Sequence, residues 1–235
     1  MNRLKLIAFD ADDTLWDCQG HFEKVMQQLY NELQPWADRE RSAQELFSTE
    51  RKNMPLLGFG VKAFTLSMLE TAMRVSHNEM SAARLSTILQ ACYSLLTFPT
   101  TPLPGVVETL RRIREDGRWR MVVFTKGELQ DQENKLKRSG LADFFDDVEI
   151  TSDKTQHEFL QLCWHQDIHP SEMLMVGNSL KSDIAPALAI GSWAVHIPFH
   201  VTWELEHTES FDHPRLFHID HFSALAKLIN LPEGS

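Results

Sequence analysis

An apolar run that leads directly into two carboxylates is the feature that most constrains this fold. The run covers residues 4–9, and Asp10 and Asp12 follow it, two positions apart. Because side chains alternate between the two sides of a strand, both carboxylates are expected on one side at its carboxyl end, where parallel sheets carry their sites. Like charges this close repel each other, which favours a bound cation or a shared proton-transfer role. The alternative is a solvated turn, since Asp is common where strands end.

Short apolar runs alternate with helix-period segments from about residue 101 onward. This alternation predicts parallel strands joined by helical crossovers. Pro104 marks a helix start, and Gly117 and Gly140 stand where helix C-caps are expected. With the first run there are five or six strands, and right-handed crossovers give a doubly wound, mostly parallel, three-layer α/β domain of Rossmann-like type. The later runs are residues 121–124, 148–150, 173–176 and 193–197.

A helical insertion is predicted between the first and second strands. Residues 17–98 contain several apolar stripes of helical period and no strand-like alternation. We therefore expect a core domain of residues 1–16 and 99–235 and an inserted helical-bundle cap of residues 17–98. Since the insertion begins directly after the carboxylates, we expect it to cover them as a lid. Its stripes should form the bundle core, and its loops are the better candidates for specificity. Those candidates are Trp16, Cys18, His21, Phe22 and residues 56–60.

Charge and composition exclude several classes of function. The 23 basic and 33 acidic residues give a net charge of −10, which argues against a general nucleic-acid or membrane-surface binder. A phosphorylated substrate must therefore be held by local positive charge. The three widely spaced cysteines predict neither a disulfide framework nor a zinc site. With no signal-like start and no run near the ~20 apolar residues of a membrane span, a cytoplasmic location is expected, while oligomeric state is not indicated.

Polar residues follow the later predicted strands at the same edge of the sheet. Thr125 follows the second run, Lys154 the third, and Asn178 and Asp183 the fourth. Each has an ordinary explanation alone, as a turn residue, a surface cation or a residue near a helix start. Their order and positions together favour one site.

With Asp-x-Asp-x-Thr, a Thr after the second strand, a Lys, and a Gly-Asn-(x)4-Asp element, the chain resembles the haloacid dehalogenase-like hydrolase superfamily over nearly its whole length. The helical insertion resembles the family's helical (C1) cap, and small-molecule phosphatases are its most similar members. The resemblance implies that Asp10 attacks phosphorus and forms an aspartyl-phosphate. It implies that Asp12 protonates the leaving group and then activates water, a task that calls for a raised pKa. Thr14 is expected to support the turn.

The resemblance also implies a Mg²⁺ site formed by Asp10, the main-chain carbonyl of Asp12, Asn178 and Asp183. Phosphate oxygens are then expected to be held by residues of the second and third strand ends. Two departures from the family pattern are Asn178, where many relatives have a charged Asp, and Thr155, where many have Pro. The loss of charge at Asn178 predicts weaker metal binding. The expected phosphate-holding residues are Asp10, Thr125, Lys126, Gly127 and Lys154.

These patterns favour a Mg²⁺-dependent phosphomonoester hydrolase that acts on a small phosphorylated metabolite. The alternatives are a phosphomutase of the same superfamily and a weakly catalytic or non-catalytic binding protein on this scaffold. Dehalogenation is less favoured, because the chain retains Asp12 and a phosphate-type last motif. The loop of residues 196–204 is expected near the same edge, with His200 and Trp203 as candidate substrate or cap contacts.

Overall fold

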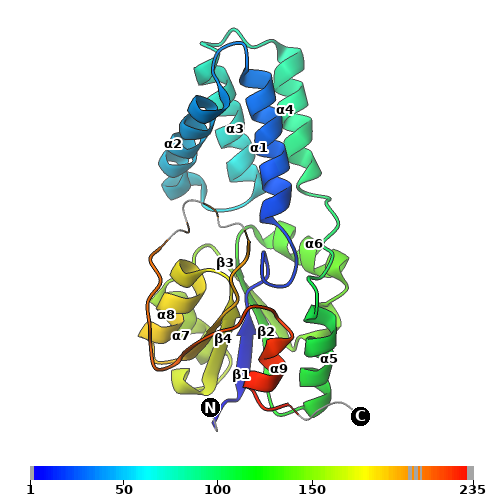
Figure 1. Ribbon diagram of the computed structural model, residues 1–235, viewed down its shortest axis with the longest axis vertical. Coiled ribbons are helices and arrows are strands. Elements are labelled where there is room, and N and C mark those ends of the chain that lie inside the picture. The colour runs from blue at the N-terminus through cyan, green and yellow to red at the C-terminus, as the bar shows by residue number, and fades with distance from the viewer. Residues whose placement is uncertain (1–2, 201–202, 204–205, 207, 232–235) are drawn as a thin grey trace. The chain divides into compact units, whose positions relative to one another are not determined.

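A six-stranded, fully parallel sheet forms the centre of the fold, with strand order β3-β2-β1-β4-β5-β6. Strands β1 to β4 are labelled in Figure 1. The structure is a computed structural model that describes residues 3–200, 203, 206 and 208–231. β1 lies in the middle of the sheet, where Phe9 is in register with Val123 of β2 and Val176 of β4. The strands are β1 (Leu6–Phe9), β2 (Arg120–Lys126), β3 (Asp147–Thr151), β4 (Met173–Gly177), β5 (Trp193–His196) and β6 (Leu216–His218).

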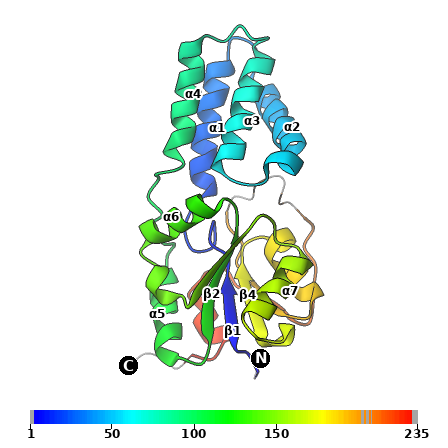
Figure 2. The ribbon, with the colours of Figure 1, turned by 180° about the vertical axis from the view of Figure 1, so that it is seen from behind.

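Helices cover both faces of the sheet (Figures 1 and 2). Phe159 of α7 and Ala187 of α8 pack against alternate residues of β1, β2 and β4 on one face. On the other face, Phe9 packs against Phe145 and Phe222, and α5 contacts α9. β1 and β4 are buried along their whole length, as expected for strands covered on both sides. These helices are α5 (Val106–Asp116), α6 (Leu129–Ser139), α7 (Gln156–His165), α8 (Ala185–Ala189) and α9 (Ala224–Leu228).

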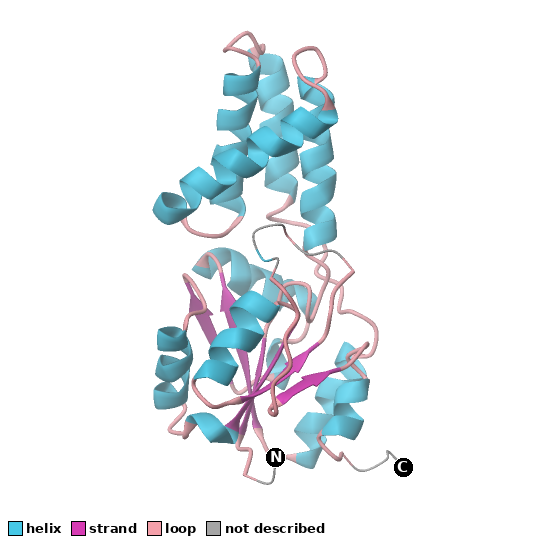
Figure 3. Ribbon diagram, turned by 60° about the vertical axis from the view of Figure 1, so that its left-hand side comes forward, coloured by secondary structure: helices cyan, strands magenta, loops and turns pink. Residues whose placement is uncertain are grey.

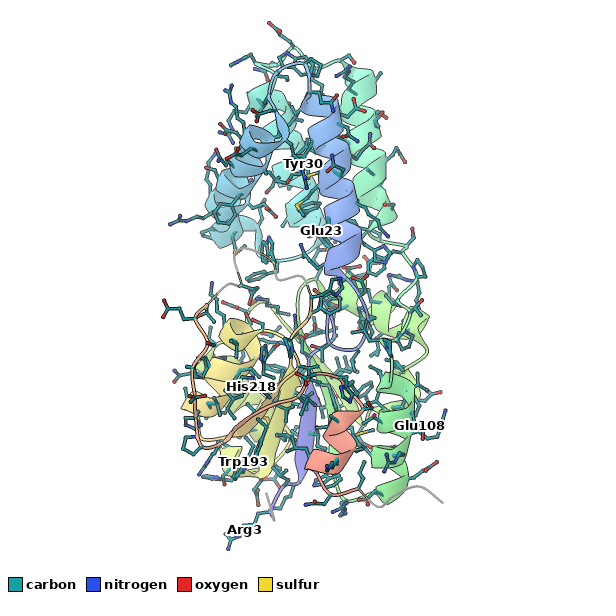
Figure 4. The ribbon with its side chains drawn as sticks, viewed as in Figure 1. Arg3, Glu23, Tyr30, Glu108, Trp193 and His218 are labelled. Atoms are coloured by element: carbon teal, nitrogen blue, oxygen red, sulfur yellow. The ribbon has the colours of Figure 1, made fainter. Side chains whose placement is uncertain are left out.

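Short helical turns complete the connections, and the C-terminal residues of the strands share one edge. Trp193, at the start of β5, and His218, at the end of β6, lie at opposite ends of the sheet (Figure 4). The predicted glycine caps of two helices are confirmed, because Gly117 and Gly140 adopt left-handed conformations with φ of 70° and 69°. The short turns are η1 (Ala142–Phe144), η2 (Pro170–Glu172) and the π-helical η3 (Leu180–Ile184).

The chain divides into two compact units, one of Met1–Asp17 with Thr100–Ser235 and the other of Cys18–Pro99. The regular structure of the second unit is all helical, as Figure 3 shows by its colouring, and this unit follows β1 in the chain. It therefore confirms a helical insertion between the first two strands. Its role as a lid and the exact domain limits given above stay predictions. The four helices are α1 (Gln19–Leu33), α2 (Arg39–Leu57), α3 (Val61–Val75) and α4 (Ala82–Ser94).

The bundle has its own apolar core, centred on fully buried residues such as Leu29, Met68 and Ile88. α2 lacks the apolar stripe that identified its neighbours, because two of its three buried residues are Ser42 and Thr49. Among the specificity candidates, His21 stacks on Phe98 at 4.2 Å and Phe22 packs on Phe64 at 4.9 Å, so both contribute to packing within the bundle. Leu56 is 87% exposed and remains available for contacts.

The structure shows the state of the cysteines and the character of the helices. Cys18, Cys92 and Cys163 are all buried and carry free thiols. In the part of the chain that the structure describes, no helix has the length and apolar character needed to cross a membrane.

The aromatic contact between α7 and β2 is expected to be a major source of stability. Phe159 is fully buried, and its ring meets Phe124 edge to face at 4.8 Å. Phe159→Ala should lower the free energy of unfolding by about 3–5 kcal/mol, measured by urea denaturation, because it removes a large buried side chain and leaves a cavity. Trp164→Ala is the matched control on the same helix, where the side chain is 78% exposed, and it should change stability by less than about 0.5 kcal/mol. Equal losses in the two variants would contradict this assignment of the core.

Candidate active site

The turn that follows β1 separates the two carboxylates. β1 ends at Phe9, so strand alternation does not extend to Asp12. Asp13 adopts a left-handed conformation with φ of 62°, which Asp tolerates better than most residues, and the Leu15 amide donates to the Ala11 carbonyl at 2.8 Å. The side chains of Asp10 and Asp12 therefore meet different partners, although both follow the same strand.

Asp10 forms a buried ion triad with Lys154 and Asp183. Lys154 Nζ lies 2.5 Å from Asp10 Oδ1 and 2.7 Å from Asp183 Oδ1. The three residues come from the end of β1, the loop after β3 and η3, and the Lys154 side chain is only 1% exposed. Thr14 Oγ1 donates to the other oxygen of Asp10 at 2.9 Å. The fold thus fixes both oxygens of the Asp10 carboxylate, and three of the predicted site residues are brought together.

Burial and charge shift the pKa values within this triad. Burial, with the neighbouring Asp183 charge, raises the pKa of Asp10 to about 7, although Lys154 opposes the shift. Burial lowers the pKa of Lys154, but the two carboxylates outweigh burial, so its pKa lies above the usual value. Lys154 is therefore a permanent positive charge at the site, as a holder of phosphate oxygens needs to be.

Asp183 is held rigidly by the main chain beside it. The Ser179 amide donates to Asp183 Oδ2 at 3.0 Å, while Oδ1 accepts from Lys154. Gly177 makes this approach possible, because a Cβ at that position would stand 2.3 Å from Asp183 Oδ2. Both oxygens of Asp183 thus already accept hydrogen bonds, and its predicted part in a metal site stays a prediction.

The loop between β3 and α7 shows what Thr155 does in place of a proline. Thr155 is the N-cap of α7, where its hydroxyl accepts from the His157 amide at 3.2 Å. Glu158 completes a capping box by accepting from the Thr155 amide at 3.0 Å. The helix start directly after Lys154 is therefore fixed by side-chain capping, so this departure from the family pattern leaves Lys154 well supported.

The end of β2 places Thr125 and Lys126 at the same edge of the sheet. Thr125 is buried, at 2% exposure, next to Lys126 as the last residue of the strand. Lys126 Nζ donates to Ser182 Oγ at 2.8 Å and to Glu206 Oε1 at 2.5 Å, so its charge is directed toward η3 and residue 206. Gly127 follows with φ of 143°, a region that favours glycine. A phosphate-holding role for these three residues stays a prediction.

Asp12 is surrounded by hydrogen-bond donors. Trp16 Nε1 donates to Asp12 Oδ1 at 2.8 Å, and Gln132 Nε2 donates to Oδ2 at 2.9 Å. Lys135 Nζ lies 3.2 Å from Oδ1 and 3.0 Å from Oδ2. Burial raises the pKa of Asp12, but Lys135 and these hydrogen bonds outweigh it, so the pKa lies below its usual value. The expected raised pKa is therefore wrong for this structure, because the sequence pattern did not reveal that α6 brings a buried ammonium to this carboxylate.

The oxygen atoms suited to a divalent cation lie next to Thr14. Its hydroxyl is 2.9 Å from Asp10 Oδ2 and 3.2 Å from Asn178 Oδ1, so a carboxyl oxygen and an amide oxygen converge on one point. Mg²⁺ commonly takes one or two carboxylates and completes its shell with waters and substrate oxygens. Among the described residues no group of three His, Cys, Asp or Glu side chains could hold a metal. This oxygen-only donor set, with a single charged ligand, fits Mg²⁺ and does not suit a metal that needs a full protein cage.

The residues predicted beyond β5 lie only partly within the described chain. His196 Nε2 is 2.9 Å from the Asn178 carbonyl, so the start of this loop does contact the last motif. The His200 ring packs on Phe199 at 4.2 Å, and the Trp203 carbonyl accepts from the Glu206 amide at 2.8 Å. Neither observation bears on substrate, so the roles of His200 and Trp203 stay predictions.

Sequence reasoning missed the polar residues that surround the predicted ones. Lys135 and Gln132 were part of a helix identified only by its apolar positions, and Glu206 had no motif around it. Glu206 accepts from Lys126, and also from Ser179 Oγ and Ser182 Oγ at 2.6 and 2.5 Å. The spacing of Asp131, Gln132 and Lys135 could have indicated these contacts, because it places three polar side chains on one side of a helix.

Gly177→Ala tests the close approach of Asp183. The added methyl group would overlap a carboxylate that a main-chain amide holds in place, so Asp183 and Lys154 must move. We expect lower stability in thermal unfolding and a loss of most activity in an assay of phosphate release. Gly117→Ala is the control: no atom lies within 4 Å of an added Cβ there, and only the strain of its φ of 70° remains. Normal activity in Gly177→Ala would show that the triad does not depend on this contact.

The raised pKa of Asp10 predicts a pH-dependent stability difference in chelator. A carboxyl group whose folded pKa is about 7, above its ordinary value of 3.8, contributes stability at low pH that is lost as pH rises through 7. Asp10→Asn does not ionise, so its free energy of unfolding relative to the parent should increase between pH 5 and pH 8. Urea denaturation in EDTA at several pH values measures this. A difference that stays constant across that range would contradict the assignment.

Comparison with known proteins identifies the family. Residues 4–191 match the family model described as haloacid dehalogenase-like hydrolase. The chain is 27% identical over 213 residues to glyceraldehyde 3-phosphate phosphatase of Methanothermobacter thermautotrophicus, covering 88% of this chain and 91% of the relative. It is also 27% identical to the pyrimidine 5'-nucleotidase YjjG of Escherichia coli, covering 79% of this chain and 82% of that one.

Solved structures agree in fold. A haloacid dehalogenase-like family hydrolase from Xanthomonas campestris has a TM-score of 0.88 and 30% identity, covering 97% of this chain and 91% of that one. The hydrolase YfnB from Bacillus subtilis, whose structure contains magnesium, has a TM-score of 0.67 at 15% identity, covering 97% and 99% of the two chains, and shows the fold alone. With the motif residues assembled at one sheet edge and a family model that matches most of its length, the chain belongs to the haloacid dehalogenase-like hydrolase family.

Proposed function

We propose that this protein is a Mg²⁺-dependent phosphomonoester hydrolase that acts on a small phosphorylated metabolite through an aspartyl-phosphate. The observation that carries the proposal is the contrast between its two neighbouring carboxylates. Asp10 is buried between Lys154, Thr14 and Asp183, whereas Asp12 faces Trp16 and the donors of α6. Two carboxyl groups in different surroundings suit two different chemical roles. Similarity to phosphatases of a triose phosphate and a nucleotide supports the reaction class.

Asp10 is the nucleophile in this proposal. An Asp10 carboxylate oxygen forms a bond to phosphorus while the bond from phosphorus to the substrate oxygen breaks, and that oxygen takes a proton from Asp12, which enters this step in its protonated form. In the second step a water oxygen attacks phosphorus, the bond to Asp10 breaks, and Asp12 accepts the proton of the water. The first step releases the alcohol and the second releases phosphate, and the two steps together return Asp10 and Asp12 to their starting states.

The charge of the transferred phosphoryl group is balanced locally. Lys154 already contacts Asp10 at 2.5 Å, so it lies next to the atom that would carry the phosphoryl group. In this proposal Thr125 and the main chain of Lys126 and Gly127, at the end of the adjacent strand β2, hold further oxygens. Such fixed donors stabilise the charge that develops in phosphoryl transfer. They also explain how a chain with a net charge of −10 could bind an anion.

Asp10, the main-chain carbonyl of Asp12 and Asn178 would hold Mg²⁺, with Asp183 adding negative charge nearby. When bound, the cation supplies charge neutralisation and orientation for the phosphate oxygens. Asn178 contributes an uncharged ligand, so we expect weaker metal affinity than an Asp in its place would give. The substrate remains defined only by class, because the relatives act on compounds as different as a triose phosphate and a nucleotide.

Hydrolysis of 4-nitrophenyl phosphate tests the proposal. The parent protein should release nitrophenol with Mg²⁺ and lose that activity in EDTA, and added Mg²⁺ should restore it. Asp10→Asn should lower kcat by more than about 1,000-fold, because it removes the group that forms the covalent intermediate. Asp143→Asn, an exposed carboxylate in η1, is the control and should match the parent.

The outcomes separate the alternatives. Full activity in Asp10→Asn, or undiminished activity in EDTA, would contradict the mechanism. Labelled phosphate trapped on the protein without release would favour a mutase, and tight binding of a phosphorylated metabolite without turnover would favour a binding protein.

A further inference from the structure

Besides Ser139 at its last position, α6 buries three polar side chains that the proposed mechanism does not use. Asp131, Gln132 and Lys135 are 6%, 4% and 2% exposed. Removal of an ammonium group or an amide from water costs free energy unless partners replace the water. Helix formation does not require these residue types at these positions, because apolar residues would pack there at lower cost. Their burial therefore calls for a separate explanation.

Lys135 and Gln132 contact Asp12 directly, and Asp131 contacts Lys135. Lys135 reaches both carboxylate oxygens of Asp12, and Gln132 reaches Oδ2. Asp131 supports Lys135 from one turn earlier, with its Oδ2 3.3 Å from Nζ. The same Gln132 amide donates to the Lys126 carbonyl at 3.0 Å, so it links Asp12 to the end of β2. Trp16 also donates to Oδ1, so three side chains fix the orientation of the Asp12 carboxylate.

In the part of the chain that the structure describes, two buried oxygen atoms of Asp131 and Gln132 lack hydrogen-bond partners, so stability alone does not explain why these polar residues are buried. Among the described residues, Asp131 Oδ1 and Gln132 Oε1 are buried without a hydrogen-bond partner. A buried polar atom without a partner destabilises the folded state, because it has lost its hydrogen bonds to water. In contrast, the Asp12 side chain remains 27% exposed, so the carboxylate that they hold is accessible from outside. The polar residues around the accessible Asp12 carboxylate thus lower the stability of the fold, which is typical of a functional site.

We propose that Lys135 and Gln132 are positioning residues, which hold the Asp12 carboxylate in the orientation from which it exchanges a proton with the leaving oxygen and with water. This inference rests on the proposed phosphatase function and deepens it. Neither residue contacts the phosphoryl group. They act through Asp12, and Asp131 keeps Lys135 in place. Loss of either residue lets the carboxylate rotate within its partly exposed site.

The leaving-group dependence of kcat/KM tests the role of Lys135 and Gln132. kcat/KM reports the first step, and proton donation matters more when the leaving group is a poor one. 4-Nitrophenyl phosphate has a good leaving group, and phenyl phosphate a poorer one. For Lys135→Met and Gln132→Leu we expect kcat/KM to fall about 10- to 100-fold more with phenyl phosphate than with 4-nitrophenyl phosphate. Lys137→Met, an exposed residue of the same helix, should match the parent with both substrates.

A double-variant cycle separates positioning from a general structural effect. If Lys135 acts through Asp12, then Asp12→Asn combined with Lys135→Met should be no slower with phenyl phosphate than Asp12→Asn alone. Additive losses, or an unchanged ratio between the two substrates in both single variants, would overturn the inference. Because Lys135→Met leaves Asp131 unpaired, thermal unfolding is measured alongside. The double variant Asp131→Asn with Lys135→Met replaces it if the single variant does not fold.

The failure of this inference is distinct from the failure of the proposed function. Activity that survives in Asp10→Asn would remove the covalent mechanism itself, whatever the α6 variants do. An inactive Asp10→Asn variant together with parent-like α6 variants would leave the phosphatase in place and overturn only the positioning role.

Discussion

The contact between Lys154 and two carboxylates is the interaction on which the rest of the site depends. It joins the end of β1, the loop after β3 and η3, which follow strands of one parallel sheet with the order β3-β2-β1-β4 and so lie at the same edge. A buried ion pair of this kind adds little net stability, since the cost of desolvation offsets much of the attraction. Its value lies in geometry: an ammonium held by two opposing charges has few other positions available. Lys154 and Thr14 thereby fix the two oxygens of the Asp10 carboxylate.

The turn after β1 gives the Asp10 and Asp12 carboxylates different surroundings, as their different proposed roles require. Asp13 in the left-handed region reverses the chain, so that Asp12 turns toward α6 while Asp10 stays between Thr14 and Lys154. A strand that continued past Phe9 would have kept both groups on one side. The short length of β1 is therefore as important to the chemistry as the residues that follow it.

The sequence predicted the parts of this protein that depend on local pattern. The parallel sheet, the helical insertion and the grouping of Asp10, Lys154 and Asp183 follow from buried strands and from residues at their ends. α2 was missed because Ser42 and Thr49 replace apolar residues on its buried side. β6 was missed because Leu216 and Phe217 are only partly buried and His218 is exposed. The surroundings of Asp12 were missed for another reason. A buried lysine such as Lys135 looks like a surface lysine until its distant partner is known.

Gly127, in the turn after β2, packs so closely against Gln132 of α6 that the two positions limit each other's side chains. A Cβ at position 127 would stand 3.0 Å from the Gln132 amide nitrogen and 3.3 Å from its Cγ. The two positions therefore cannot vary independently. Among homologous chains, a side chain at the first should occur together with a shorter or differently shaped residue at the second, and such chains would have to orient their acid–base carboxylate by other means.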